Sequence, residues 1–195
     1  FLAVLEAFRE DYKNVIEVCS RCLEFDRGNV QMLQFRGTAN FLLGTQAQYA
    51  GLNPLTYYEK STADFTAAFK LQPADINLLI GRADAYANWA VYTGNASFFE
   101  SALADFDAAL RVDPKRFDVW VRRGIVCANY GFQKQQSGAD PIREYATAIE
   151  NFDVAIKLKP HDSAAWSARG WTRYLVGNYS SERAEWYEKA IADFN

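Results

Sequence analysis

Apolar residues recur along the chain with the spacing of an α-helix. Positions i, i+4, i+7 and i+8 of one segment are all apolar: Ala102, Phe106, Ala109 and Leu110. The same spacing starts again at Ala148. Such a stripe is typical of an amphipathic helix that buries one face. Because proline cannot continue the hydrogen-bond ladder of a helix, Pro114 and Pro160 predict that these helices end in short turns.

Two independent markers divide the chain into repeats. The first marker is the proline that ends a helix, and its members step by 41 and then 46 residues: Pro73, Pro114 and Pro160. The second marker is an arginine followed by a small residue, and its members keep the same register: Arg36-Gly37, Arg82-Ala83, Arg123-Gly124 and Arg169-Gly170. Arg27 stands where the first repeat would carry its proline. Each unit therefore contains two helices, which can bury their apolar faces only against neighbouring units.

This organisation predicts an all-α fold, an α-solenoid of stacked antiparallel helix pairs with about nine or ten helices. We expect a single array over residues 1–195, in which three full units stand between two partial ones: 1–29, 30–75, 76–116, 117–162 and 163–195. The segment Phe1 to Phe8 is apolar for a free terminus, and Asn195 falls inside a predicted helix. Both features indicate a fragment of a longer chain.

The units resemble the tetratricopeptide repeat. The residues that carry the resemblance are Trp166-x-x-x-Gly170, Gly177-Asn178-Tyr179, Ala190 and Phe194, together with Ala102-x-x-x-Phe106-x-x-Ala109 and Val112-Asp113-Pro114. The likeness covers nearly the whole chain. It implies a right-handed superhelix that holds other proteins and is not an enzyme. The sequence departs from the family in length, because the family unit has about 34 residues and these units have 41 to 46.

The surplus residues fall between the two helices of each pair. Asn53-Pro54, Asp140-Pro141 and the box from Ser97 to Glu100 are typical helix starts. We therefore expect second helices that are lengthened at their N-terminal ends, after long loops at about 45–52 and 131–139. The triplets at Asn95 and Asn178 match the glycosylation pattern. Ser97 and Ser180 are interpreted instead as helix caps.

In the family, the first helix of each pair lines a concave groove. The face opposite the Trp/Gly stripe supplies the candidate partner-binding residues: Gln34, Thr38, Phe41, Ile80, Asp84, Val121, Ile125, Ser167, Trp171 and Tyr174. The set is polar toward the N-terminus and apolar-aromatic toward the C-terminus, which predicts a protein or peptide partner with apolar anchors. The alternative is that some of these side chains only pack against the neighbouring repeat. The resemblance does not extend to the lysine and asparagine clamp that binds acidic chaperone tails, so this partner is not expected.

The repeated arginines have two interpretations. Arg36, Arg82, Arg123 and Arg169 recur together with Asp64, Asp105, Asn151 and Asp193 on the second helices. The structural interpretation is a repeated hydrogen bond between helices, since the guanidinium fork suits a carboxylate or an amide oxygen. The functional interpretation is an arginine ladder for an acidic partner. We favour the first, because a small residue that predicts close packing follows each arginine: Gly37, Ala83, Gly124 and Gly170.

Little in the sequence suggests catalysis, metal binding or a cofactor. Cys19-x-x-Cys22 is a lone pair without further ligands, and His161, the single histidine, has no evident catalytic partner. The net charge of −3 opposes nucleic-acid binding, and no apolar run reaches the roughly 20 residues of a membrane span. Three cysteines favour a reducing, intracellular compartment, although a targeting segment can be missing.

The sequence therefore predicts a scaffold or adaptor within a multiprotein assembly. One alternative is a non-catalytic regulatory or docking segment of a larger enzyme. An RNA-binding helical repeat is a weaker alternative.

Overall fold

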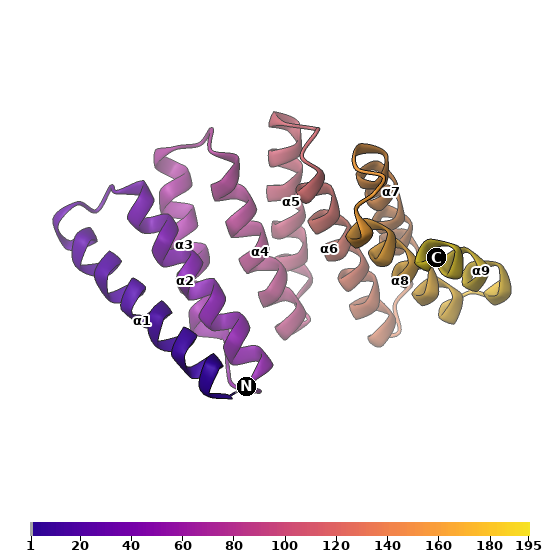
Figure 1. Ribbon diagram of the computed structural model, residues 1–195, viewed down its shortest axis with the longest axis horizontal. Helices are drawn as coiled ribbons and strands as arrows, with labels where there is room; N and C mark the ends of the chain where they lie inside the picture. Colours follow the sequence, from indigo (N-terminus) through magenta and orange to yellow (C-terminus); the bar gives the residue numbers. More distant parts are fainter. Residues whose placement is uncertain (1) are drawn as a thin grey trace. The chain divides into compact units, whose positions relative to one another are not determined.

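A computed structural model describes residues 2–195, with side chains from Glu10 onward. The described residues form nine α-helices and no strand (Figure 1). The helices are α1 (Leu2–Phe25), α2 (Val30–Tyr49), α3 (Leu55–Leu71), α4 (Ile76–Thr93), α5 (Ala96–Val112), α6 (Phe117–Gln136), α7 (Ile142–Leu158), α8 (Ser163–Tyr179) and α9 (Arg183–Phe194). The all-α prediction is confirmed, and the helices end before the three repeated prolines as expected.

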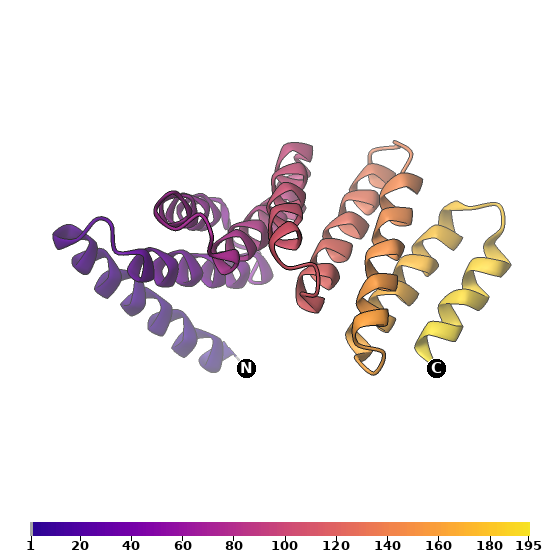
Figure 2. The same cartoon turned by 90° about the horizontal axis from the view of Figure 1, so that it is seen from above.

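The chain divides into two compact units. Unit 1 comprises residues 1–93 with α1 to α4, and unit 2 comprises residues 94–195 with α5 to α9. Within each unit, consecutive helices pack side by side and alternate in direction (Figures 1 and 2). The boundary lies between α4 and α5, inside the predicted repeat 76–116.

The turns between repeats all have four residues: 26–29, 72–75, 113–116 and 159–162. In the three later turns, an aspartate oxygen accepts the backbone N–H two residues ahead: Asp75, Asp113 and Asp162. In the first turn, Asn29 Oδ1 accepts the N–H of Met32 at 3.1 Å. The bonds of Asn29, Asp75 and Asp162 satisfy backbone donors that the start of a helix leaves unpaired, and that of Asp113 closes the turn before α6.

The two predicted long loops are wrong, because helix continues through most of their residues. α2 runs to Tyr49 and α6 runs to Gln136, so the connections are only 50–54 and 137–141. Alanine and glutamine favour helix at the ends of α2 and α6. Each connection then contains a glycine at positive φ, Gly51 at 70° and Gly138 at 77°, a conformation that glycine adopts without steric cost. The predicted starts of α3 and α7 are supported, since Asn53 and Asp140 accept the first helical N–H groups at 3.0 Å.

Ser97 is not the cap of α5. Asn95 holds this position, and its side-chain oxygen accepts the backbone N–H of Ser97 at 3.0 Å. An asparagine two residues earlier satisfies the donors just as well, so the serine box placed the start two residues late. Ser180 is not the N-cap of α9, which is Glu182, but ends α8, and its hydroxyl accepts the N–H of Glu182 at 3.0 Å.

The helices of a pair approach each other closely at the repeated small residues. A Cβ atom built at Gly124 would lie 2.6 Å from the ring of Phe152, which is fully buried on α7. Similar contacts recur at Gly37 and Gly170. A second glycine series, which the sequence analysis missed, faces a tyrosine ring in the same way: Gly44 with Tyr58, Gly131 with Tyr145 and Gly177 with Tyr187.

Candidate functional site

The exposed face of the first helices differs between the two units. In unit 2, the first helices α6 and α8 contact each other. Three predicted groove residues on them are exposed: Ile125 (43%), Trp171 (57%) and Tyr174 (40%). Ser167 is exposed as well, whereas Val121 is half-buried and packs against a core cluster that includes Phe152 of α7. This face of α6 and α8, named here the α6–α8 face, is therefore apolar, uncharged at the predicted positions and open.

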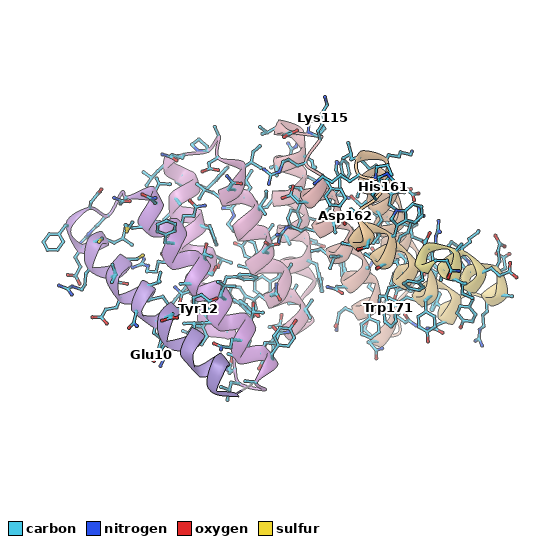
Figure 3. The ribbon with its side chains drawn as sticks, in the orientation of Figure 1. Glu10, Tyr12, Lys115, His161, Asp162 and Trp171 are labelled. Atoms are coloured by element: carbon cyan, nitrogen blue, oxygen red, sulfur yellow. The ribbon has the colours of Figure 1, made fainter. Side chains whose placement is uncertain are left out.

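Trp171 and Tyr174 form part of an aromatic stack. Their ring centroids are 5.2 Å apart, and Tyr174 stacks in turn on Tyr187 of α9 at 5.7 Å. The hydroxyl of Tyr187 donates to Asn178 Oδ1 at 2.8 Å, which fixes the last ring against α8. Figure 3 labels Trp171 on α8, away from His161 in the turn that precedes this helix.

Two residues of this face were missed from the sequence. Tyr187 belongs to the tyrosine series of the second helices, which predicts a buried ring and not a partner of Trp171. Phe132 lies two turns after Ile125 on α6 and is 45% exposed. Extending the i, i+4, i+7 stripe by one more turn would have found it.

The predicted groove residues of unit 1 form a different surface. Gln34 and Phe41 are half-buried, and Thr38 is exposed but donates its hydroxyl hydrogen to Gln34 O at 2.9 Å. Asp84 is half-buried. Ile80 is buried, so it offers no contact to a partner, contrary to the expectation.

Ile80 is buried because α4 is covered on more than one face at this point. Leu78 and Leu79 are also buried, and three consecutive residues of a helix point in three directions. This part of α4 is thus covered on several sides. A sequence stripe indicates one face of a helix but not how many faces are covered.

The repeated arginines are engaged inside the units. They donate to the second helix of their own pair wherever that pair lies within one unit: Arg36 to Asp64, Arg123 to Asn151 and Arg169 to Asp193. Arg36 makes two parallel bonds to Asp64, at 2.9 and 2.6 Å, and this hydrogen bonding raises the pKa of the arginine above its usual value. A guanidinium held by a bidentate carboxylate has little capacity left for an acidic partner.

Each arginine also reaches the preceding second helix, to a residue 16 positions earlier in the chain. These acceptors are Ser20 for Arg36, Thr66 for Arg82, Asp107 for Arg123 and Asp153 for Arg169. They step by 46, 41 and 46 residues, the register of the repeat. They were not predicted from the sequence because their residue types vary, although their spacing does not. These contacts support the structural interpretation of the arginines.

Two of the three cysteines, Cys19 and Cys127, are buried. Burial raises the pKa of Cys127 to about 11 and also raises the pKa of Cys19. A thiol needs its thiolate form to attack or to bind a metal. Among the residues that the structure describes, no cluster of three or more His, Cys, Asp or Glu side chains could hold a metal ion. No helix in the described part of the chain is long and apolar enough to cross a membrane.

Comparisons with known proteins agree with this architecture. Residues 142–195, which comprise α7 to α9, match the family model described as tetratricopeptide repeat. The tetratricopeptide resemblance is confirmed. No curated protein matches the sequence.

Solved structures extend the similarity of fold over nearly all of the chain. A crystal structure of MamA is 17% identical, with a TM-score of 0.60 over 94% of this chain and 89% of that chain. TTC0263, a thermophilic tetratricopeptide protein of Thermus thermophilus, is also 17% identical, with a TM-score of 0.61 over 98% and 84%. MamA from Desulfovibrio magneticus RS-1 is 14% identical, with a TM-score of 0.51 over 95% and 94%. These identities are low, so the likeness concerns the α-solenoid of helix pairs.

Proposed function

We propose that this chain is a non-catalytic scaffold for protein interaction, and that the α6–α8 face binds a segment of a partner protein. The observation that carries the proposal is the exposed aromatic pair Trp171 and Tyr174 on a first helix. Tryptophan and tyrosine dominate the energetics of protein interfaces. Tetratricopeptide repeats are helical scaffolds, and this role needs no catalytic group.

The chemistry of the face indicates the kind of partner. Ile125 adds an exposed aliphatic side chain from α6, and Ser167 adds a hydroxyl near the start of α8. An amphipathic helix or an extended segment with bulky apolar anchors matches such a surface. An acidic partner is disfavoured, because Arg123 and Arg169 in this unit are already bonded to Asp107, Asn151, Asp153 and Asp193.

The alternative that Trp171 only packs against the neighbouring repeat is less well supported. More than half of its surface is exposed, and its ring rests on Tyr174. The remaining predicted positions of unit 1, Gln34, Thr38, Phe41 and Asp84, stay predictions of further contacts.

The test is the variant Trp171→Ala in the full chain, compared with Phe25→Ala. Phe25 is 91% exposed at the end of α1, outside the proposed face. Both variants serve as bait beside the unaltered chain. A partner held by the face is recovered with the unaltered chain and with Phe25→Ala, and is lost with Trp171→Ala. With the purified partner, Trp171→Ala should weaken binding by about 2 kcal/mol or more, which is roughly 30-fold.

Thermal stability measured on the same samples separates binding from folding. The midpoint should stay close to that of the unaltered chain, because the ring is exposed. If Trp171→Ala unfolds unit 2, or binds the partner as tightly as Phe25→Ala does, the face is wrongly assigned.

A further inference from the structure

Unit 1 contains an open surface pocket of about 370 Å³ between α1 and α2, called the cavity below. This volume is within the range of roughly 300–1,000 Å³ that is usual for ligand sites. Its lining residues are Ser20, Leu23, Glu24, Arg27, Leu33 and Arg36. Leu23 and Leu33 are buried and form an aliphatic floor, whereas Glu24 and Arg27 are exposed at the rim.

The repeat register places an aromatic residue at the equivalent place of every later repeat. Two positions decide this. The first is held by Leu23, Phe69, Leu110 and Ile156, and the second by Leu33, Leu79, Trp120 and Trp166. Each later repeat thus has one aromatic residue, which is Phe69, Trp120 or Trp166. The first repeat has two leucines instead, and the cavity lies beside them.

In two of the later repeats, the repeated arginine of the register lies over the aromatic ring. Arg82 Cζ is 5.1 Å from the ring centre of Phe69, and Arg169 Cζ is 4.6 Å from the ring centre of Trp166. Such a guanidinium–ring contact is favourable because the ring face is electron-rich. Arg36 is the equivalent arginine of the first repeat, and it lines the cavity.

The indole of the later repeats also makes a specific hydrogen bond. Trp120 Nε1 donates to Pro114 O at 2.8 Å, and Trp166 Nε1 donates to Pro160 O at 2.8 Å. Arg27 holds the same register position as these prolines and lies at the rim of the cavity. The first repeat therefore keeps the aliphatic floor and the arginine, and its backbone has a carbonyl at the register position of the acceptor.

We propose that this cavity binds an aromatic side chain, an indole in particular, which is presented by a partner protein. The incoming ring takes the place that Trp166 occupies in its own repeat, with one face against the aliphatic floor. Arg36 provides the cation, and its two bonds to Asp64 hold the guanidinium in place. Its positive charge complements the electron-rich face of the ring. The site lies in unit 1 and is independent of the α6–α8 face.

The first test uses N-acetyltryptophanamide as the probe and the full chain labelled with ¹⁵N. Titration should shift backbone amide signals of residues 20–36, with a dissociation constant on the order of 1 mM, since so small a ligand makes few contacts. N-acetylleucinamide is the matched control and should bind at least about 10-fold more weakly, because it lacks the ring. Shifts confined to α8, or equal binding of both probes, would overturn the proposal.

The second test fills the cavity from within. Leu33→Trp introduces the residue of the last two repeats, and Leu23→Phe introduces that of the second repeat. Both should weaken probe binding at least about 10-fold without lowering the melting temperature, because the ring fits the empty volume. Leu79→Trp is the control. The second repeat already has a ring at the other register position, Phe69, so overpacking should lower the melting temperature by at least about 2 °C.

The comparison of the filled variants decides between an open niche and a closed one. If Leu33→Trp and Leu23→Phe both destabilise the chain as Leu79→Trp does, the first repeat has no room for a ring. If both retain the affinity of the unaltered chain for the probe, the probe binds elsewhere. Either result refutes the site.

Discussion

The first helices of unit 1 and unit 2 are alike where they face the second helices and unlike where they face outward. Arg36 in unit 1 and Arg169 in unit 2 make the same pair of bonds to an aspartate. The position two residues after each of the four repeated arginines holds a different residue type in every repeat: Thr38, Asp84, Ile125 and Trp171. The positions that recur carry the packing of the repeat, and the positions that vary are free to carry specificity.

The same contrast distinguishes the two proposed sites. The cavity of unit 1 lies in the one repeat that has no aromatic residue at either of two interior positions, Leu23 and Leu33. The α6–α8 face differs from the surface of unit 1 because Trp171 of α8 holds the register position that the polar Thr38 holds in α2. Changes at recurring positions should therefore cost stability in either unit, whereas changes at exposed varying positions should leave the fold intact.

The largest effect is expected from removing a recurring carboxylate. Asp64→Ala leaves the guanidinium of Arg36 without its main partner in a largely buried setting. The free energy of unfolding should fall by about 3 kcal/mol, the lower end of the range for a broken buried pair. Chemical denaturation measures this loss. Glu10→Ala is the control, because it removes an exposed ion pair with Lys13 and should change stability by less than about 1 kcal/mol. Equal losses for the two variants would show that the arginine bond is not structural.

A smaller loss is expected at the close contact of α6 with α7. Gly124→Leu inserts a side chain where even a Cβ atom would lie 2.6 Å from the Phe152 ring. Overpacking of this kind costs about 1–3 kcal/mol, which the same denaturation experiment can resolve. Gly28→Ala is a suitable comparison, since the nearest atom to its new Cβ would be 3.6 Å away. A stability of Gly124→Leu equal to that of the unaltered chain would mean that the helices can separate at no cost.

The smallest effect is expected at a varying position of unit 1. Thr38→Ala removes an exposed hydroxyl that bonds only to its own helix. Alanine has the higher helix propensity, so stability should change by less than about 0.7 kcal/mol. Binding of a partner that depends on Trp171 should also stay within about twofold. A loss of that partner with Thr38→Ala would show that unit 1 contributes to the same interface.

Several features of the fold were predictable from sequence because they depend on local chemistry. The proline and arginine markers predicted the helix pairs and the short turns between repeats, since a proline inside a helix interrupts its hydrogen-bond ladder. The helix starts after Asn53 and Asp140 were predictable because both residues are favourable caps followed by a proline, which is well tolerated in the first turn of a helix. The loops at 45–52 and 131–139 were misjudged, because alanine and glutamine extend a helix until a glycine permits the chain to turn.

Tertiary structure alone decided which repeated or exposed residues can meet a partner. The stripe that selected Ile80 also selected Ile125, and only packing shows that the first is buried and the second is open. The stack of Tyr187 on Tyr174 joins two helices, so no spacing within one helix could predict it. The cavity beside Leu33 likewise depends on side-chain volumes contributed by α1 and α2 together. The sequence by itself determined the period of the helices and the residues that recur, because these follow from backbone geometry. Burial, ring stacking and empty volume depend on neighbours distant in the chain, and they became visible only in the packed molecule.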